Sequence, residues 1–185
     1  MQDSELAVSA RTDPNAFAVL MRRYEDKLLR YLRRSFGVTE EDGEDILQNA
    51  FIKAYQHLNG YDATLPFSSW MYRISRNEAI DLMRKRKVTL VPIETDDDDT
   101  ADLADLLSST TDIERDVGRV IEKERIMKAL GKLKEKHRTA LILRYLEEKE
   151  YSEISDIMQV PMGTVATLIS RAKKDLKVLW TSQEK

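Results

Sequence analysis

The sequence contains no cysteine, and only 4 of its 185 residues are proline and 6 are glycine. The absence of cysteine excludes disulfide bonds and metal sites with thiolate ligands. No apolar run approaches the roughly 18 residues that a membrane-spanning helix requires. The N-terminus, residues 1–12, lacks the basic start and the apolar stretch of a signal peptide. Together these absences predict a cytoplasmic protein that does not insert into a membrane.

The charge of the chain is unevenly distributed. The formal net charge is −3, an unusual sign for a protein that binds nucleic acid. Segment 94–116, however, has ten acidic residues and one basic residue, a charge of −9, so the rest of the chain carries +6. Basic residues gather in segments 22–34, 84–87 and 171–177. The acidic total therefore conceals basic faces that suit phosphate groups.

Apolar residues recur at helical spacing on both sides of this acidic segment, without strand-like alternation and without an internal repeat. Asp13 and Pro14 suit the start of the first long helix, and Gly37 suits its end. Thr39 opens a second helix that closes at Asn59-Gly60. The spacing predicts further helices at about 67–86, 118–132, 135–147, 150–158 and 163–180.

The segment between the two helical blocks differs from both of them in composition. Residues 88–117 offer too little apolar surface to offset the entropy lost on ordering, so we expect a flexible acidic linker there. The prediction is an all-α protein with two small helical domains, residues 1–87 and 118–185, joined by this linker.

The last two expected helices have the layout of a helix-turn-helix, in which the second helix enters the major groove by its N-terminal end. Gly163 opens this second helix. Its apolar stripe is expected to pack against the domain and comprises Val165, Leu168, Ile169, Ala172, Leu176 and Leu179. The opposite face suits base edges and phosphates and comprises Thr167, Ser170, Arg171 and Lys174. The alternative is a plain amphipathic terminal helix with a solvated face.

The expected helix 67–86 combines aromatic, polar and basic residues. Arg73, Arg76 and Arg84 share one arc of the helical wheel, with Asn77 at its border. Cationic side chains beside aromatic and polar groups are what single-stranded DNA binding requires. The alternative is that the arginines form a solvated face. For Trp70 we expect burial in the core.

Three motifs, in this order, resemble the sigma-70 family of bacterial RNA polymerase sigma factors. Residues 45–55, DILQNAFIKAY, resemble conserved region 2.2, and residues 67–84 resemble the segment that melts and reads the −10 promoter element. Residues 133–145 and the helix-turn-helix, 153–172, resemble region 4, which reads the −35 element. The short linker resembles the extracytoplasmic-function (ECF) group. The resemblance implies a non-catalytic, cofactor-free protein that binds RNA polymerase core and directs promoter-specific transcription initiation.

The resemblance also implies partners and roles for individual residues. The implied partners of the protein are the clamp helices of the largest polymerase subunit, the polymerase flap, and promoter DNA in double- and single-stranded form. An anti-sigma factor is a further candidate. The implied core-binding residues are Asp45, Gln48, Asn49 and Lys53. Those implied for the −10 element are Phe67, Ser68, Arg73, Arg76, Asn77 and Arg84. Those implied for the −35 element are Thr164, Thr167, Ser170, Arg171 and Lys174. The loop before Pro66 resembles the part that captures a flipped base.

The sequence departs from the family pattern at several positions. Asn49 stands where the family usually has glutamate, which removes a charge from the polymerase-facing helix. Lys149-Glu150 replace a usual Leu-Ser pair, so we expect Ser152 to cap the next helix. Ala166 and Leu168 replace the usual basic residues, and we expect Leu168 to pack into the domain. Discrimination at the −35 element is therefore predicted to be weak.

Two other functions fit part of the pattern. One is a helix-turn-helix regulator unrelated to polymerase, and the other is a degenerate sigma-like protein that binds polymerase but selects no promoter. No catalytic or metal site is expected. The run 96–99 lacks the spaced ligands and turn glycine of a calcium loop, and His57 and His137 have no evident catalytic partners.

Overall fold

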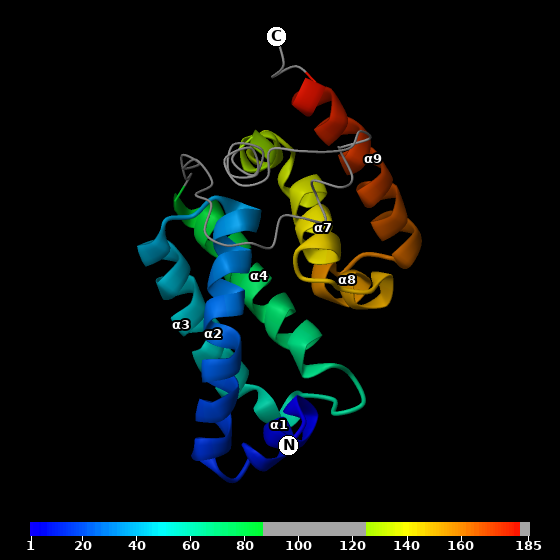
Figure 1. Cartoon of the computed structure of the whole chain (residues 1–185). Coiled ribbons are helices and arrows are strands. Elements are labelled where there is room, and N and C mark those ends of the chain that lie inside the picture. The colour runs from blue at the N-terminus through cyan, green and yellow to red at the C-terminus, as the bar shows by residue number, and fades with distance from the viewer. Residues whose placement is uncertain (87–124, 182–185) are drawn as a thin grey trace, which may run out of the picture.

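The computed structural model of the protein describes residues 1–86 and 125–181, and these residues form helices and short connections without a β-strand (Figure 1). The helices of the first domain are α1 (Asp3–Ser9), α2 (Pro14–Phe36), α3 (Glu40–Gln56), the 3-10 helix η1 (Leu58–Gly60) and α4 (Phe67–Arg86). The second domain contains a helical segment at 125–131, α7 (Glu135–Tyr145), α8 (Tyr151–Met158) and α9 (Met162–Thr181). The predicted all-α fold is confirmed.

Local hydrogen bonds account for the ends of the two long N-terminal helices. Asp13 Oδ1 accepts a hydrogen bond from the Asn15 N–H at 2.9 Å, ahead of a proline at the first helical position. Gly37 ends α2 with a φ of 65°, a left-handed conformation that glycine adopts without a steric penalty. Thr39 Oγ1 accepts a hydrogen bond from the Asp42 N–H at 3.1 Å and begins α3. The predicted helix ends at Asp13, Gly37 and Thr39 are therefore confirmed.

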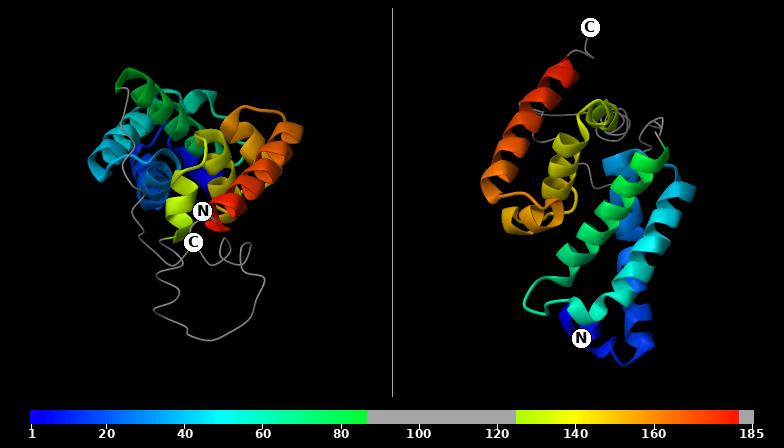
Figure 2. Two further views of the ribbon diagram at one scale, coloured as in Figure 1. Left: turned by 90° about the horizontal axis from the view of Figure 1, so that it is seen from above. Right: turned by 180° about the vertical axis from the view of Figure 1, so that it is seen from behind.

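In the first domain, α2, α3 and α4 pack along one another (Figure 2). An aromatic cluster of Tyr24, Tyr61, Phe67 and Trp70 holds the start of α4. The ring centroids of Tyr61, Phe67 and Trp70 lie 5.3 to 5.6 Å apart, and Tyr24 packs edge-on against Phe67. Trp70 is 8% exposed, which confirms its predicted burial. The start of α4 is thus anchored on a rigid apolar base.

In the second domain, α7, α8 and α9 pack together, and α8, a short turn and α9 form the predicted helix-turn-helix. Ser155 Oγ donates a hydrogen bond to the Val160 carbonyl at 2.6 Å across the turn. The buried stripe of α9 comprises Val165, Ile169, Ala172, Leu176 and Trp180. Leu168 and Leu179 are partly buried against the same core, so the prediction that Leu168 packs into the domain is confirmed.

The structure also departs from the sequence-based expectations. It contains α1, which the apolar pattern does not predict. Helix α8 begins at Tyr151, and Glu153 Oε2 accepts a hydrogen bond from the Glu150 N–H at 3.1 Å. The expectation that Ser152 caps this helix is therefore wrong. The predicted linker 88–117 lies outside the described residues, as does the first part of the helix expected at 118–132.

Candidate nucleic-acid interface

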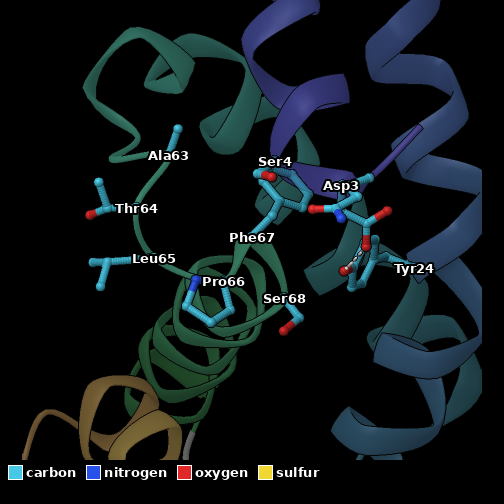
Figure 3. Close-up of a pocket in the computed structure, with 10 residues that line it drawn as sticks. Asp3, Ser4, Tyr24, Ala63, Thr64, Leu65, Pro66, Phe67 and Ser68 are labelled. Atoms are coloured by element: carbon cyan, nitrogen blue, oxygen red, sulfur yellow. Dashed lines mark hydrogen bonds between the residues drawn. The ribbon is translucent and has the colours of Figure 1, made fainter.

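A pocket of about 540 Å³ opens beside the start of α4 (Figure 3). Loop residues 63–66 and Phe67 and Ser68 of α4 line one part of it, and residues 2–4 and Tyr24 line another. The Tyr24 hydroxyl donates a hydrogen bond to the Asp3 carboxylate, which joins α2 to α1 at the pocket wall. Burial raises the pKa of Tyr24, so this hydroxyl keeps its proton. The pocket thus combines aromatic surface with hydroxyl and carboxylate groups.

The loop between η1 and α4 is held in one conformation by hydrogen bonds. Asp62 Oδ1 accepts from the N–H and the hydroxyl of Thr64 at 2.9 and 2.8 Å, and the backbone hydrogen bond lowers the pKa of Asp62. The Tyr61 hydroxyl donates to the Leu65 carbonyl at 2.6 Å. Arg11 Nη2 donates to the Tyr61 carbonyl at 2.7 Å. The loop is therefore ordered before any ligand binds.

The residues of α4 implied for the −10 element differ in exposure. Phe67 is buried in the aromatic cluster, so its ring supports the pocket from beneath. Asn77 and Arg84 are exposed, and Arg84 lies 3.7 Å from Asp81 on the same helix. The side chains of Arg73 and Arg76 are only 27% and 8% exposed. Two of the implied phosphate ligands are therefore covered in this structure.

The residues of α9 implied for the −35 element are exposed: Thr164, Thr167, Ser170, Arg171 and Lys174. The Thr167 hydroxyl donates a hydrogen bond to the Gly163 carbonyl at 2.9 Å, so its proton is already used within the helix. Met162 and Ala166 are exposed at this end of α9. The first turn presents no cation, and Arg171 follows two turns after Thr164.

The implied core-binding residues of α3 are all exposed: Asp45, Gln48, Asn49 and Lys53. The ammonium group of Lys53 pairs with the Glu78 carboxylate of α4 and so also joins two helices. The same exposed side carries Ile52 and Tyr55, which are 49% and 46% exposed. Sequence reasoning missed these two residues, although as apolar side chains outside the buried helical stripe of α3 they were a detectable signal.

The second domain covers the arginines of α4. Arg73 Nη1 lies 2.6 Å from Asp156 Oδ1 of α8, and Arg76 Nη2 lies 3.3 Å from Glu135 Oε1 of α7. Further hydrogen bonds across the domains join Ser68 to Lys149 at 2.8 Å, Ser69 to Glu153 at 3.0 Å, and Tyr72 to Glu147. None of these pairs is local in sequence, and no pattern in the chain indicates them.

Two glutamates at this contact have pKa values shifted in opposite directions. Burial raises the pKa of Glu147, against the hydrogen bond that it accepts from Tyr72. Burial also acts to raise the pKa of Glu153, but hydrogen bonds and the charge of Lys149 outweigh it, and the net pKa is lowered. Glu153 is therefore firmly ionised, whereas Glu147 is the more easily protonated of the two.

Residues 20–89 match Sigma-70 region 2, and residues 123–176 match Sigma-70, region 4. The ECF RNA polymerase sigma factor SigW of Bacillus subtilis is 34% identical over 168 residues, which cover 89% of each chain. The ECF RNA polymerase sigma-E factor of Haemophilus influenzae is 33% identical over 165 residues, 88% of this chain and 86% of that one. The chain belongs to the ECF RNA polymerase sigma factors.

The structure of CnrH in complex with the cytosolic domain of CnrY resembles this sigma factor across its length. The TM-score is 0.70 at 25% sequence identity, and the match covers 97% of each chain. The match to region 2 decides against a helix-turn-helix regulator unrelated to polymerase, which would share the region 4 match alone. The protein is a sigma factor for transcription initiation.

The two matched regions contain most of the three surfaces described above. Region 2 contains the exposed side of α3, α4 and the pocket lining apart from residues 2–4, and region 4 contains the helix-turn-helix. Within residues 1–86 and 125–181 no group of three His, Asp or Glu side chains is placed to hold a metal ion. No helix of these ranges is long and apolar enough to cross a membrane.

Proposed function

We propose that this sigma factor docks on the polymerase core through the exposed side of α3 and opens promoter DNA with α4 and its preceding loop. The observation that carries the proposal is the pocket beside the start of α4, bounded by an ordered loop and followed along the helix by arginines. Strand opening releases unstacked bases, and extruding one costs a few kcal/mol, which a prepared pocket offsets. The arginines neutralise the adjoining phosphates.

The pocket suits one unpaired base of the non-template strand. Its aromatic surface, through Phe67 and Tyr24, contributes apolar contact, and Ser68, Thr64 and Asp3 offer polar groups to a base edge. Because the loop is ordered before binding, little further entropy is lost when a base enters. These features support base capture at the −10 element as the role of this site.

The exposed side of α3 is the proposed surface for the clamp helices of the largest polymerase subunit. Ile52 and Tyr55 add exposed apolar area beside Asp45, Gln48 and Asn49. Apolar anchors surrounded by polar residues are typical of protein interfaces. The polymerase flap and an anti-sigma factor are further proposed partners. We also propose that the protein acts in the cytoplasm and carries out no catalysis itself.

We propose that the two domains have different binding roles. Residues 1–87 bind core polymerase and the −10 element, residues 118–185 contact the −35 element, and residues 88–117 connect them. On α9, Thr164 and Thr167 face base edges, while Arg171 and Lys174 face phosphates. Promoter DNA is therefore contacted as a duplex by the second domain and as a single strand by the first.

The substitution Asn77→Ala tests the proposal. Asn77 is exposed on α4, whereas the proposed polymerase-binding surface is on α3. Loss of the Asn77 side chain should therefore impair promoter melting and leave core binding intact. Permanganate reactivity of unpaired thymines in the holoenzyme complex measures melting, and co-purification with core polymerase measures binding. Asn59→Ala, an exposed change on η1, is the control. A footprint of normal size and position with Asn77→Ala would remove Asn77 from the proposed site.

A further inference from the structure

Helix α1 and the residue before it supply a wall of the pocket beside α4. Residues 2–4 line the pocket, although the match to Sigma-70 region 2 begins only at residue 20. Asp3 lies on one side of the pocket, and Thr64 of the preceding loop lies on the other (Figure 3). A base that enters the pocket therefore meets side chains from the N-terminal helix as well as from the loop.

The carboxylate of Asp3 is held in place by two residues of α2. Arg23 Nη1 lies 2.6 Å from Asp3 Oδ1, and the Tyr24 hydroxyl donates a hydrogen bond to Asp3 Oδ2. Arg23 Nη1 also donates to the Met1 carbonyl at 3.3 Å. The side chain of Asp3 is still 32% exposed. The carboxylate is therefore fixed in position and accessible from the pocket that it lines.

Helix α1 is itself fixed against the first domain. Its apolar residues Leu6 and Ala7 are buried, as is Ala10 directly after the helix. Arg11 Nη2 donates a hydrogen bond at 2.7 Å to the Tyr61 carbonyl, where the loop on the opposite side of the pocket begins. The position of α1 relative to this loop is therefore set before a base binds, which is what a site that discriminates between bases requires.

Three polar groups of the pocket can face a ligand only as hydrogen-bond acceptors. The Tyr24 hydroxyl has given its proton to Asp3, and the Thr64 hydroxyl has given its proton to Asp62 at 2.8 Å. An aspartate carboxylate has about four acceptor positions and no proton to donate. The two hydrogen bonds from α2 leave about two of these positions of Asp3 for a ligand.

The four DNA bases differ in what they offer to such acceptors. Adenine, cytosine and guanine each carry an exocyclic amino group, and aspartate accepts a hydrogen bond from a group of this kind. Thymine carries carbonyl oxygens and a methyl group instead, and a carbonyl placed against a carboxylate leaves both acceptors unpaired. The hydroxyl groups of Ser4 and Ser68, which also line the pocket, can donate to a ring nitrogen of the base.

We infer that Asp3 is a specificity residue of the pocket and makes it select a base with an exocyclic amino group over thymine at one position of the −10 element. This inference rests on the proposed capture of a base by the pocket. Arg23 and Tyr24 are positioning residues, which act through Asp3. The loop and α4 shape the pocket, and α1 contributes the group that distinguishes the base edge.

The substitution Asp3→Asn tests the inference, because it keeps the size of the side chain, removes its charge and adds an amide donor that suits a thymine carbonyl. Core polymerase is reconstituted with each variant and supplied with a promoter library randomised over the −10 element. With the wild-type chain, thymine should be depleted at one position. Asp3→Asn should raise the thymine frequency there about tenfold, the effect expected of one hydrogen bond to a charged group. Asp26→Asn, the same change at an exposed position of α2, is the control and should select as wild type does.

Removal of the amino group from the DNA is the chemical counterpart of this substitution. At the position found in the library, the preferred base is replaced by its analogue without that group: purine for adenine, 2-pyrimidinone for cytosine or hypoxanthine for guanine. The rate of promoter opening, followed by permanganate reactivity, should fall about tenfold with wild type and about threefold or less with Asp3→Asn. An equal fall with both chains, or equal base frequencies at every −10 position, would overturn the inference.

Tyr24→Phe provides a second variant, at a positioning residue. It removes the hydroxyl that holds Asp3 and keeps the ring that packs edge-on against Phe67, with 5.6 Å between the ring centroids. A role in packing alone would leave the base frequencies unchanged, whereas the inference expects part of the exclusion of thymine to be lost. Circular dichroism checks that both variants are folded. Unchanged base frequencies with folded Tyr24→Phe would contradict the positioning of Asp3 by Tyr24.

Filling the pocket distinguishes this inference from the proposed function. Ala63→Trp places a large ring at an exposed loop residue that lines the pocket, and it should block base capture. If promoter melting remains intact with Ala63→Trp, the proposed function fails. If Ala63→Trp abolishes melting while Asp3→Asn leaves the base frequencies unchanged, base capture stands and the role of Asp3 alone is wrong.

Discussion

The two helices of this sigma factor that we propose as its DNA-facing helices are built differently. Helix α4 starts on an aromatic cluster, borders a pocket with an ordered loop and carries Arg73 and Arg76. Helix α9 presents an uncharged first turn, and its exposed cations begin only at Arg171. A pocket selects a base by shape and several contacts, whereas single hydrogen bonds from threonine discriminate weakly beside the bidentate contact of arginine with guanine. We therefore expect sequence selectivity to reside mainly in the first domain.

Truncating the aromatic cluster should produce the largest loss of stability and so the largest difference between α4 and α9. Trp70→Ala leaves a cavity beneath the start of α4 and should lower the free energy of unfolding of the first domain by about 3–5 kcal/mol. Met162→Ala, at the start of α9, changes a side chain that is 57% exposed and should cost about 0.5 kcal/mol or less. Urea denaturation followed by far-UV circular dichroism measures both. Similar losses for the two variants would contradict the difference between the helices.

Removing one cation from each helix should separate their roles. In the holoenzyme, Arg73→Ala should impair melting and reduce the salt dependence of single-strand binding by a slope of about 0.7. Lys174→Ala should leave melting of the bound complex intact and reduce the slope for duplex binding by about 0.9. Titrations at several salt concentrations and permanganate footprints give the two readouts. A melting defect as severe with Lys174→Ala would show that the helices do not divide the work.

Adding a cation to α9 should make the two helices more alike. Leu168 is partly buried against the core, so Leu168→Arg should cost about 1 kcal/mol of stability, less than full burial of a leucine is worth. The new charge should raise duplex affinity and steepen its salt dependence by a slope of about 0.9. Ser170→Arg, on the exposed side, is the control that adds a charge without loss of packing. Unchanged salt dependence with Leu168→Arg would place this residue away from DNA.

The smallest expected effect concerns acidity at the domain contact. The pKa of Glu147 is raised by burial, so folding favours its protonated form, and its contribution to stability grows as pH falls from neutral towards the ordinary glutamate range. Glu147→Gln should remove that gain. The pKa of Glu153 is lowered, so its contribution is present above the ordinary range and is lost as pH falls. Denaturation midpoints across mildly acidic pH should therefore shift in opposite directions for Glu147→Gln and Glu153→Gln, each relative to wild type.

The sequence predicted those features that depend on local pattern. The caps at Asp13 and Thr39, the left-handed end at Gly37 and the burial of Trp70 all follow from neighbouring residues or from helical spacing. The buried stripe of α9 follows for the same reason. Such features are determined within a few turns of the chain, which is the range that periodicity and capping rules describe.

The features that the sequence did not predict depend on contacts between distant residues. Arg73 and Asp156 are 83 positions apart, and Arg138 and Ser35 are 103 positions apart. Short α1 has few apolar residues of its own, and it is held by packing on α2 and by the hydrogen bond between Asp3 and Tyr24. The N-cap of α8 is Glu150, with Glu153 bonding back to its N–H, because the helix begins at Tyr151, two residues earlier than a cap at Ser152 would allow.

Promoter selection by the reconstituted holoenzyme tests the central claim most directly. Core polymerase with this sigma factor is supplied with a library randomised at both promoter elements, and the transcribed sequences are read. If selectivity resides in the first domain, the −10 element should emerge sharply defined and the −35 element should tolerate most bases. A −35 motif as sharply defined as the −10 motif, with guanine required at fixed positions, would contradict the account.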